Sequence, residues 1–237
     1  APRFDHDPVT GECLGLLIEE SRRNKIVYSE DLSNSEWDSI NNATATPSSV
    51  TAPDGVGTMW LVDLSDTAGT SSVGSRLYQN ALSFKGLVNT FSFYARSVSG
   101  TGTFPVAYYD GSDYIKSYVT LTEQIQRYEV SCPAGISSTS NNIFGFSRRG
   151  TTHDETLTQA YIWGCQIETG AEATSYIPTE DSTVTRAADI AEITGTNFSS
   201  FYSEANGSIF VQARGAALTG NPLSVEVHDG TANNRHT

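Results

Sequence analysis

The stretch LTQAYIWGCQIETGAEATSYIPTEDSTVTRAADIAEI, residues 157–193, decides how the chain is organised. Its first part alternates two sets of side chains, Tyr161, Trp163, Cys165 and Ile167 against Ala160, Ile162, Gly164 and Gln166. Such alternation predicts a β-strand over 158–167. The run ends at 168–171, and Pro178 lies in a segment with neither helical nor strand pattern. We therefore expect one domain that this strand completes and another that begins after it.

Working back from this stretch, other segments have the same strand character. The expected strands are 25–28, 58–64, 75–82, 89–98, 104–109, 114–119, 127–132 and 142–147. The clearest is 89–98, NTFSFYARSV, which alternates apolar and polar side chains. About nine strands at this spacing, with no helical period, predict an all-β fold. The specific expectation is an antiparallel jelly-roll β-sandwich.

Composition narrows the partners of the protein. Only 17% of the 237 residues are charged, so Ser, Thr, Asn and Gly must build much of the surface. Fourteen basic against 27 acidic residues give a net charge of −13, which argues against a nucleic-acid partner. The sequence also has no apolar run long enough to cross a membrane, so no membrane insertion is expected.

Neither the cysteines nor the acidic clusters predict a metal centre. Cys13, Cys132 and Cys165 are odd in number and follow no zinc pattern, so we expect buried free thiols in a protein made in reducing cytoplasm. Asp5–Asp7 with Glu12 has the chemistry to share a hard cation, but lacks the intervals of a calcium loop. A solvated turn with capping aspartates is favoured. No cofactor is expected.

No catalytic motif can be assembled from the sequence. It contains no G-x-S-x-G, H-E-x-x-H or phosphate loop. His153–Glu155 is the most suggestive segment, because a carboxylate can orient an imidazole. Neighbouring side chains of an extended chain point to opposite faces, so these three are not expected to converge. A polar loop is favoured, and the chain is expected to be non-catalytic.

A carbohydrate site requires less: exposed aromatic rings with polar groups beside them. The hairpin around 110–113 offers Tyr109 and Tyr114 as rings and Asp110 and Asp113 as hydrogen-bond acceptors. Alternation assigns the preceding Tyr108 to the core. The alternative is that both rings simply cover the edge of the sheet.

Residues 1–24 differ from the rest of the chain. They contain turn signals and an apolar run, Leu14–Ile18, that charged residues follow. The segment is too short to be a domain and too apolar to float free. It is interpreted as an arm that packs along its own domain or a neighbouring subunit, with Leu14, Leu16, Leu17 and Ile18 as the docking side chains.

Two resemblances rest on particular motifs. From residue 25 to about 170 the chain contains, in order, a polar loop with Trp37 (expected to pack onto the sheet), LYQ at 77–79, Gly86 before TFSFYARS, YVTLTEQIQRYEVSC and QIETG. This order of motifs resembles carbohydrate-binding modules of the family 4/9 type. Two motifs flank this region: RFDHDPVTGECLGLLIEESRRNKIVYSEDLSNSEW and AYIWGCQIETGAEATSYIPTEDSTVTRAAD. They resemble bacteriophage virion fibre proteins of the head or tail, a group that includes receptor-binding proteins. This second resemblance covers residues 3–190.

These resemblances imply a non-catalytic structural fibre or spike protein of a phage particle that contributes to attachment to a host-surface glycan. The implied partners are further copies of the chain, typically in a trimer, other virion proteins and that glycan. The alternative is a non-catalytic module of a larger polysaccharide-degrading enzyme. The last strand of such modules commonly carries an Asp that holds calcium, whereas this chain has YIWGC at 161–165, so a structural calcium ion is not supported.

The expected domain organisation has four parts. Residues 1–24 form a docking arm, 25–178 the jelly roll, and 179–192 a linker. Residues 193–237, with expected strands at 207–212 and 223–227, resemble the beginning of a lectin- or laminin-G-like sandwich. Because such a sandwich needs about 100 residues, the natural polypeptide is expected to be longer.

Overall fold

The computed structural model describes residues 3–7, 10–65, 73–80, 86–109, 114–132, 143–150, 153–193, 195–201, 203, 227–228 and 235–236. The chain divides into two compact units, Ala1–Asp189 and Ile190–Thr237. No helix among the described residues is long and apolar enough to cross a membrane. The first unit holds nearly all of the described structure.

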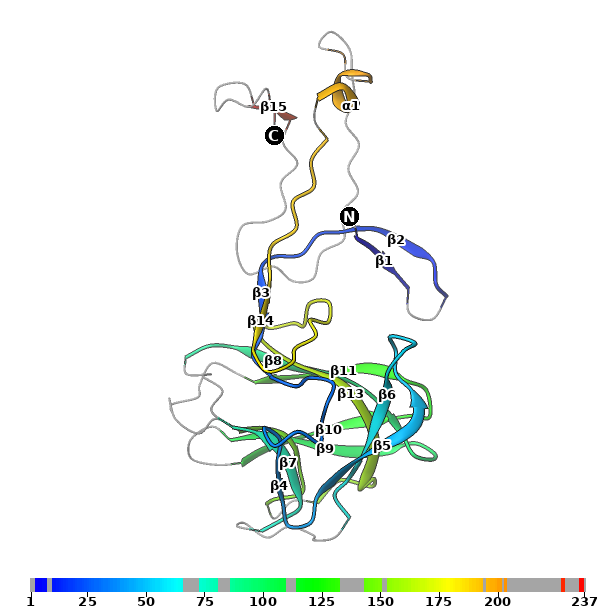
Figure 1. The fold of residues 1–237 in the computed structure, drawn as a ribbon, viewed down its shortest axis with the longest axis vertical. Helices are drawn as coiled ribbons and strands as arrows, with labels where there is room; N and C mark the ends of the chain where they lie inside the picture. Colours follow the sequence, from blue (N-terminus) through cyan, green and yellow to red (C-terminus); the bar gives the residue numbers. More distant parts are fainter. Residues whose placement is uncertain are drawn as a thin grey trace. The chain divides into compact units, whose positions relative to one another are not determined.

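Two antiparallel five-stranded sheets face one another in the first unit (Figure 1). The first, called the β9 sheet, has the order β10 (Tyr114–Leu121), β9 (Gly102–Tyr109), β12 (Ile143–Ser147), β7 (Arg76–Gln79), β4 (Asp38–Ile40). The second, called the β8 sheet, has the order β11 (Gln126–Cys132), β8 (Asn89–Ser97), β13 (Gln159–Thr169), β6 (Thr58–Asp63), β5 (Thr44–Thr51). The chain passes repeatedly between the sheets, which confirms the predicted jelly-roll sandwich.

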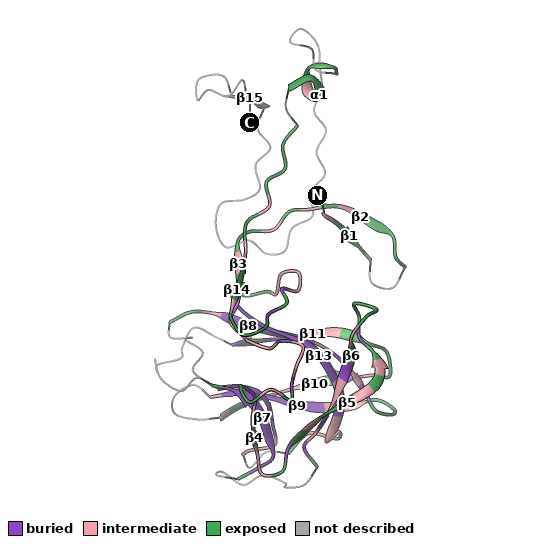
Figure 2. Cartoon of the chain, in the orientation of Figure 1, coloured by how far each residue is buried: buried purple, intermediate pink, exposed green. Residues whose placement is uncertain are grey.

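The core lies between the two sheets, where the buried residues gather (Figure 2). Phenylalanines from both sheets fill its centre: Phe91, Phe93, Phe104, Phe144 and Phe146, each fully buried. The rings of Phe91 and Phe144 have centroids 4.6 Å apart, and those of Phe93 and Phe146 meet edge to face at 5.1 Å. Such aromatic pairs lock the two sheets together.

Trp37 packs into this core from the loop before β4, as predicted. Its side chain is buried, and its indole Nε1 donates a hydrogen bond to the carbonyl oxygen of Tyr28 at 3.1 Å. Tyr28 itself has a left-handed backbone with φ of 48°, which is unusual for a residue with a side chain. The tryptophan therefore fixes an otherwise irregular turn against the sandwich.

The expected strands were wrong at 25–28 and omitted β4 and β5. Residues 25–28 form no strand; the paired segment is β3 (Arg22–Asn24), which lies beside β14 (Val184–Arg186). In 25–28 the Gln79 amide accepts from and donates to the Val27 backbone, and the amides of Lys25 and Tyr28 donate to the carbonyls of Ile167 and Glu180. Apolar residues alone indicated a strand, whereas these contacts satisfy the backbone without one.

Strand β5 was also missed, within a stretch read as a polar loop. Its sequence, TATPSSVT, has little apolar character and includes Pro47. β5 is the edge strand of the β8 sheet and pairs only with β6. An edge strand buries little surface and tolerates proline, so the usual strand signals are weak there.

The N-terminal arm is a hairpin of β1 (Arg3–His6) and β2 (Cys13–Leu17). At its base, Glu19 accepts hydrogen bonds from the Ser175 amide at 2.7 Å and from Arg3 Nη1 at 2.8 Å. Arg186 Nη1 lies 3.2 Å from the same carboxylate. These contacts join the base of the arm to the segment that follows β13.

The second unit contributes few described residues. A single helical turn, α1 (Gly195–Ser199), brings the rings of Phe198 and Phe201 to 5.6 Å, and β15 (Val227–His228) pairs with β16 (Arg235–His236). The sequence showed no helical period, so α1 was not expected. The expected strand at 207–212, and that at 223–227 except for Val227, lie outside the described residues.

The cysteines follow the expected pattern in two cases of three. Cys132 and Cys165 are buried thiols, and burial raises the pKa of Cys165. Cys13 lies in the arm and is exposed, so the expectation of burial was wrong there.

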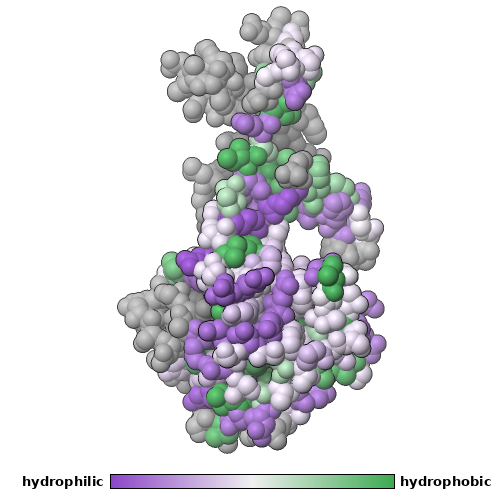
Figure 3. All heavy atoms as spheres, in the orientation of Figure 1, coloured by the Kyte–Doolittle hydropathy of each residue, from purple (hydrophilic) through white to green (hydrophobic). Residues whose placement is uncertain are grey.

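On the face drawn in Figure 3, hydrophobic residues are scattered among hydrophilic ones over the sandwich. This agrees with a surface built largely from small polar residues.

Candidate functional site

The candidate site lies on the outer face of the β9 sheet. Alternation along β9 directs Tyr108 into the core, where it is 6% exposed, and Tyr109 to the opposite face. Tyr109 pairs in register with Tyr114 on β10. Because directly opposed residues of antiparallel strands share a face, the two rings meet, with centroids 5.0 Å apart.

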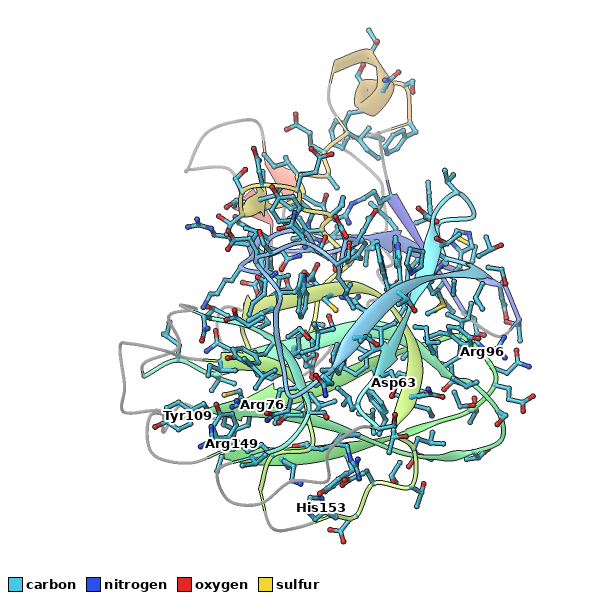
Figure 4. The ribbon with its side chains drawn as sticks, turned by 60° about the horizontal axis from the view of Figure 1, so that its bottom comes forward. Asp63, Arg76, Arg96, Tyr109, Arg149 and His153 are labelled. Atoms are coloured by element: carbon cyan, nitrogen blue, oxygen red, sulfur yellow. The ribbon has the colours of Figure 1, made fainter. Side chains whose placement is uncertain are left out.

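Two arginines surround Tyr114. The Arg76 Nη1 atom donates a hydrogen bond to the Tyr114 hydroxyl at 2.9 Å, and the Arg149 guanidinium carbon lies 4.1 Å from the centroid of the Tyr114 ring. Arg76 also lies 5.5 Å from the Tyr78 ring centroid. Figure 4 shows Arg76, Tyr109 and Arg149 close together, with His153 set apart from them. We call Arg76, Tyr78, Tyr109, Tyr114 and Arg149 the tyrosine–arginine cluster.

Small residues on the strands between β7 and β10 leave room for side chains of the cluster to meet across the sheet. β7 and β10 are separated by β12 and β9, whose outward positions between Tyr78 and Lys116 are Gly145 and Ala107. A Cβ atom at Gly145 would lie 2.2 Å from the Leu77 carbonyl oxygen, so no side chain fits there. Because these two positions carry no bulky side chain, the long Arg76 side chain can reach Tyr114.

Burial sets the electrostatics of the cluster. Arg76 is 9% exposed, and none of the described carboxylates forms an ion pair with it. Its buried Nε atom has no hydrogen-bond acceptor. Burial, together with the nearby Asp38 carboxylate, raises the pKa of Tyr78. The cluster is therefore rich in hydrogen-bond donors and carries positive charge.

The structure brings together the two predicted rings but changes their role. Tyr109 and Tyr114 are half-buried and not open platforms, and the Arg149 guanidinium occupies a face of the Tyr114 ring. Asp110 and Asp113, the predicted acceptors, lie outside the described residues. Sequence reasoning missed Arg76, Tyr78 and Arg149. The alternation of RLYQ at 76–79 could have placed the first two on the outer face.

Two of the three residues of 153–155, His153 and Glu155, lie together. The Glu155 Oε1 atom lies 3.0 Å from His153 Nδ1 and accepts a hydrogen bond from Arg148 Nε at 3.0 Å. The two residues are next but one along a segment that forms no strand. Burial alone would raise the pKa of Glu155, but the hydrogen bonds from Arg148 and His153 outweigh it and hold the pKa below the usual value.

A second aromatic group lies on the outer face of the β8 sheet. Trp163 is buried there, with its ring centroid 4.9 Å from that of Tyr176 and 5.7 Å from that of Tyr94. Gly164 adopts φ of +64° at the irregularity between β13 and β8. Tyr176 comes from the segment after β13, so this group fastens that segment to the sheet. Its rings are packed together and offer no open platform.

The predicted docking residues of the arm divide between two faces. Leu14, Leu16 and Ile18 are 46%, 46% and 45% exposed, whereas Leu17 is half-buried on the opposite face. Phe4, 53% exposed, pairs in register with Leu16 and joins the first three. Sequence reasoning missed Phe4 because the pairing of β1 with β2 was not expected. We call Phe4, Leu14, Leu16 and Ile18 the apolar face of the arm.

The suspected metal segment forms a turn. The Asp7 side chain accepts a hydrogen bond from the Thr10 amide at 2.8 Å, and the Asp5 side chain accepts one from the His6 amide at 3.0 Å. This confirms the interpretation of capping aspartates. Among the described residues, no three His, Cys, Asp or Glu side chains gather closely enough to hold a metal ion.

A separate pocket of about 360 Å³ lies beside β3 and the end of β13, lined by Ser21, Arg22, Arg23, Lys25, Thr169 and Thr185. Its cations already have partners: Arg22 with Glu20, Arg23 with Thr183, and Lys25 with Asn89. The tyrosine–arginine cluster remains the stronger candidate, because its buried arginine has no ion-pair partner among the described residues.

No protein-family model and no curated protein matches the chain. Among solved structures it is similar to the xylan-binding CBM22-1 domain of Paenibacillus barcinonensis Xyn10C, with 12% identity and a TM-score of 0.43 over 67% of this chain and 97% of that one. It is similar to the second N-terminal cellulose-binding domain of Cellulomonas fimi β-1,4-glucanase C, with 13% identity and a TM-score of 0.44 over 66% and 100%.

The chain is also similar to the enzymatically active domain of bacteriophage CBA120 tailspike protein 4, with 13% identity and a TM-score of 0.41. That match covers 61% of this chain but 21% of the tailspike chain, so this chain spans about a fifth of it. Identities this low assign neither a family nor an activity to the chain.

Proposed function

We propose that the chain is a non-catalytic, glycan-binding part of a phage fibre or spike protein, carried on the virion and contributing to host attachment. The observation that carries the proposal is the tyrosine–arginine cluster on the outer face of the β9 sheet. Two tyrosine rings in contact, with two arginines beside them, bring together aromatic groups and directed hydrogen-bond donors, the side-chain types used in sugar recognition.

The virion context is supported by the two flanking motifs. They resemble those of phage fibre proteins, and in this chain they lie together: β3 from the first pairs with β14 from the second. The ion pairs of Glu19 with Arg3 and Arg186 reinforce the same junction. Both motifs therefore serve to fix the arm to the sandwich, which suits a protein that transmits an attachment.

The proposed partner of the arm is another copy of the chain, in a trimer. One face of the hairpin is apolar and largely exposed, while most large apolar residues of the sandwich lie in the core. Exposed apolar side chains gathered on one face commonly mark contact surfaces between proteins. Copies of the chain supply identical faces, and burying them together would remove this surface from water.

The absence of catalysis is part of the proposal. A glycosidase acid needs a raised carboxyl pKa beside the substrate. The carboxylate of Glu155 has a lowered pKa, is hydrogen-bonded to Arg148, and has a side chain only 1% exposed. The charge and burial of Glu155 thus suit a structural ion pair better than proton donation.

The test is binding of the purified 237-residue chain to intact bacteria and to a printed glycan array, beside a Tyr109→Ala/Tyr114→Ala double variant. Tyr161→Ala is the matched control, since Tyr161 is a half-buried tyrosine on the β8 sheet. We expect binding that the double variant loses and the control keeps. A folded protein that binds neither cells nor glycans would disprove the attachment role.

Light scattering on the same samples separates the two contexts. A trimer favours the fibre, whereas a monomer that binds a soluble polysaccharide favours the alternative, a module of a larger polysaccharide-degrading enzyme.

A further inference from the structure

We infer that the tyrosine–arginine cluster selects an anionic glycan, one whose sugars carry a carboxylate, sulfate or phosphate group. This inference rests on the proposed function and specifies the ligand class of that same site. Two observations support it: the burial of Arg76, and the contacts that Arg76 and Arg149 make with Tyr114.

Arg76 is a buried charge that none of the described carboxylates pairs with. It is the one arginine with less than a tenth of its surface exposed among the described residues. A buried cation normally requires an ion-pair partner, because desolvation is costly. The chain has 27 acidic residues, and four of its arginines form ion pairs with them: Arg3, Arg22, Arg148 and Arg186.

The uncompensated guanidinium also keeps donor capacity. The Nη1 atom donates to the Tyr114 hydroxyl, while the buried Nε has no acceptor. Guanidinium groups bind carboxylate, sulfate and phosphate oxygens through paired N–H donors. An anion beside Arg76 would supply both the missing charge and the missing acceptor.

The use of the Tyr114 ring points the same way. A neutral sugar stacks its apolar face on an open ring, but at Tyr114 the Arg149 guanidinium lies 4.1 Å from the ring centroid. The ring therefore positions a cation. The Tyr114 hydroxyl already accepts from Arg76, which leaves its own hydrogen free to be donated. The cluster thus presents mainly donors, and an anionic acceptor fits it better than a neutral ring.

Nearby acidic side chains do not fill this role within the described structure. Asp38 on β4 pairs in register with Tyr78 and accepts a hydrogen bond from Asn80. It forms no ion pair with Arg76. Arg76 therefore brings to the cluster a positive charge that no described carboxylate pairs with, on a protein whose net charge is −13. Such a site recognises its ligand at short range, since the overall charge repels anions at distance.

The experiment uses the full chain on an array that carries neutral glycans and glycans bearing uronate, sialate, sulfate or phosphate groups. The variants are Arg76→Gln and Arg149→Gln. The matched control is Arg96→Gln, because Arg96 stacks on Tyr161 on the other sheet, with its guanidinium carbon 5.8 Å from that ring centroid. Circular dichroism confirms folding, and Arg149→Gln keeps the test informative if the buried Arg76→Gln variant unfolds.

We expect retention of anionic glycans only, a loss of at least about 10-fold in affinity for both variants, and none for the control. Affinity should also fall as salt rises from 50 to 300 mM. The anionic group on the retained glycans identifies which of the three chemistries is recognised. Binding of neutral glycans, or equal binding of anionic ones by all variants, overturns the inference while glycan binding stands. Binding to no glycan and no cell removes the proposed function itself.

Discussion

The Asp189 carboxylate accepts a hydrogen bond from the backbone amide of Glu19 at 2.8 Å, although 170 residues separate them in the chain. The Asp189 amide in turn donates to the Glu19 carbonyl at 2.8 Å. Arg3 bridges the two carboxylates. The N-terminal arm and the end of the first unit are thus one fastened junction, which the sequence presents as two unrelated flanks.

Glu19→Gln should destabilise the first unit at pH 7 and have little effect at low pH. Burial alone would raise the pKa of Glu19, but hydrogen bonds from Ser175 and Arg3 and the charge of Arg186 outweigh it, so the pKa is lowered. A lowered pKa in the folded state gives stability that is present above the unfolded pKa, near 4.3, and lost as pH falls through the folded pKa.

Urea unfolding at pH 7 should show a loss of about 1–2 kcal/mol for this variant. The difference from wild type should shrink steadily below about pH 4. Glu20→Gln is the control, since its side chain is 67% exposed and pairs only with Arg22 among the described residues. A loss that is the same at pH 7 and pH 3 would show that the charge of Glu19 is not the cause.

Asn24→Ala should be among the most damaging single changes. The fully buried Asn24 amide donates to the carbonyls of Cys165 and Ile177 and accepts from the amides of Ile26 and Ile167. Alanine leaves four buried backbone groups without partners, so we expect a loss of at least about 3 kcal/mol. Chemical denaturation measures it against Gln124→Ala, an exposed change expected to cost under about 0.5 kcal/mol. Equal stability of the two variants would contradict this role.

Much of the fold, but less of the site, follows from the sequence. The alternation in 89–98 predicted β8, because both faces of a central strand have distinct surroundings. Edge strand β5 and the segment 25–28 could not be predicted, since an edge buries little and side-chain amides replaced strand pairing. Tyr109 and Tyr114 are close in sequence, so their meeting was predictable from the hairpin.

The arginines of the site were not predictable in the same way. Arg76 comes from β7 and Arg149 from the residues after β12, and only the strand order β10–β9–β12–β7 brings them to Tyr114. Local patterns carry no information on strand order. The alternation around Leu77 indicates a face for Arg76 but not its neighbours.

Gly145→Ala should disturb both the sandwich and the site. The new Cβ atom would lie 2.2 Å from the Leu77 carbonyl oxygen and 2.6 Å from the Tyr78 Cα atom, so β7 and β12 must move apart. We expect a loss of about 2–4 kcal/mol and weaker glycan binding, because Arg76 and Tyr78 sit on β7. Gly57→Ala is the control, with its nearest contact at 3.4 Å and no left-handed φ. A Gly145→Ala protein with wild-type melting temperature would contradict the packing described.

Leu16→Glu should dissociate the proposed trimer without unfolding the protein. Leu16 lies at the centre of the apolar face of the arm, opposite Phe4, and is 46% exposed. A charge there costs little in a free arm, under about 0.5 kcal/mol, but a great deal in a buried interface between copies. Light scattering should show a trimer for wild type and a monomer for the variant at equal melting temperature. Val56 lies outside the arm and is 89% exposed, so the control variant Val56→Glu should remain trimeric. If wild type is monomeric at micromolar concentration, the apolar face of the arm does not hold copies of this chain together, and its partner must be sought among other proteins.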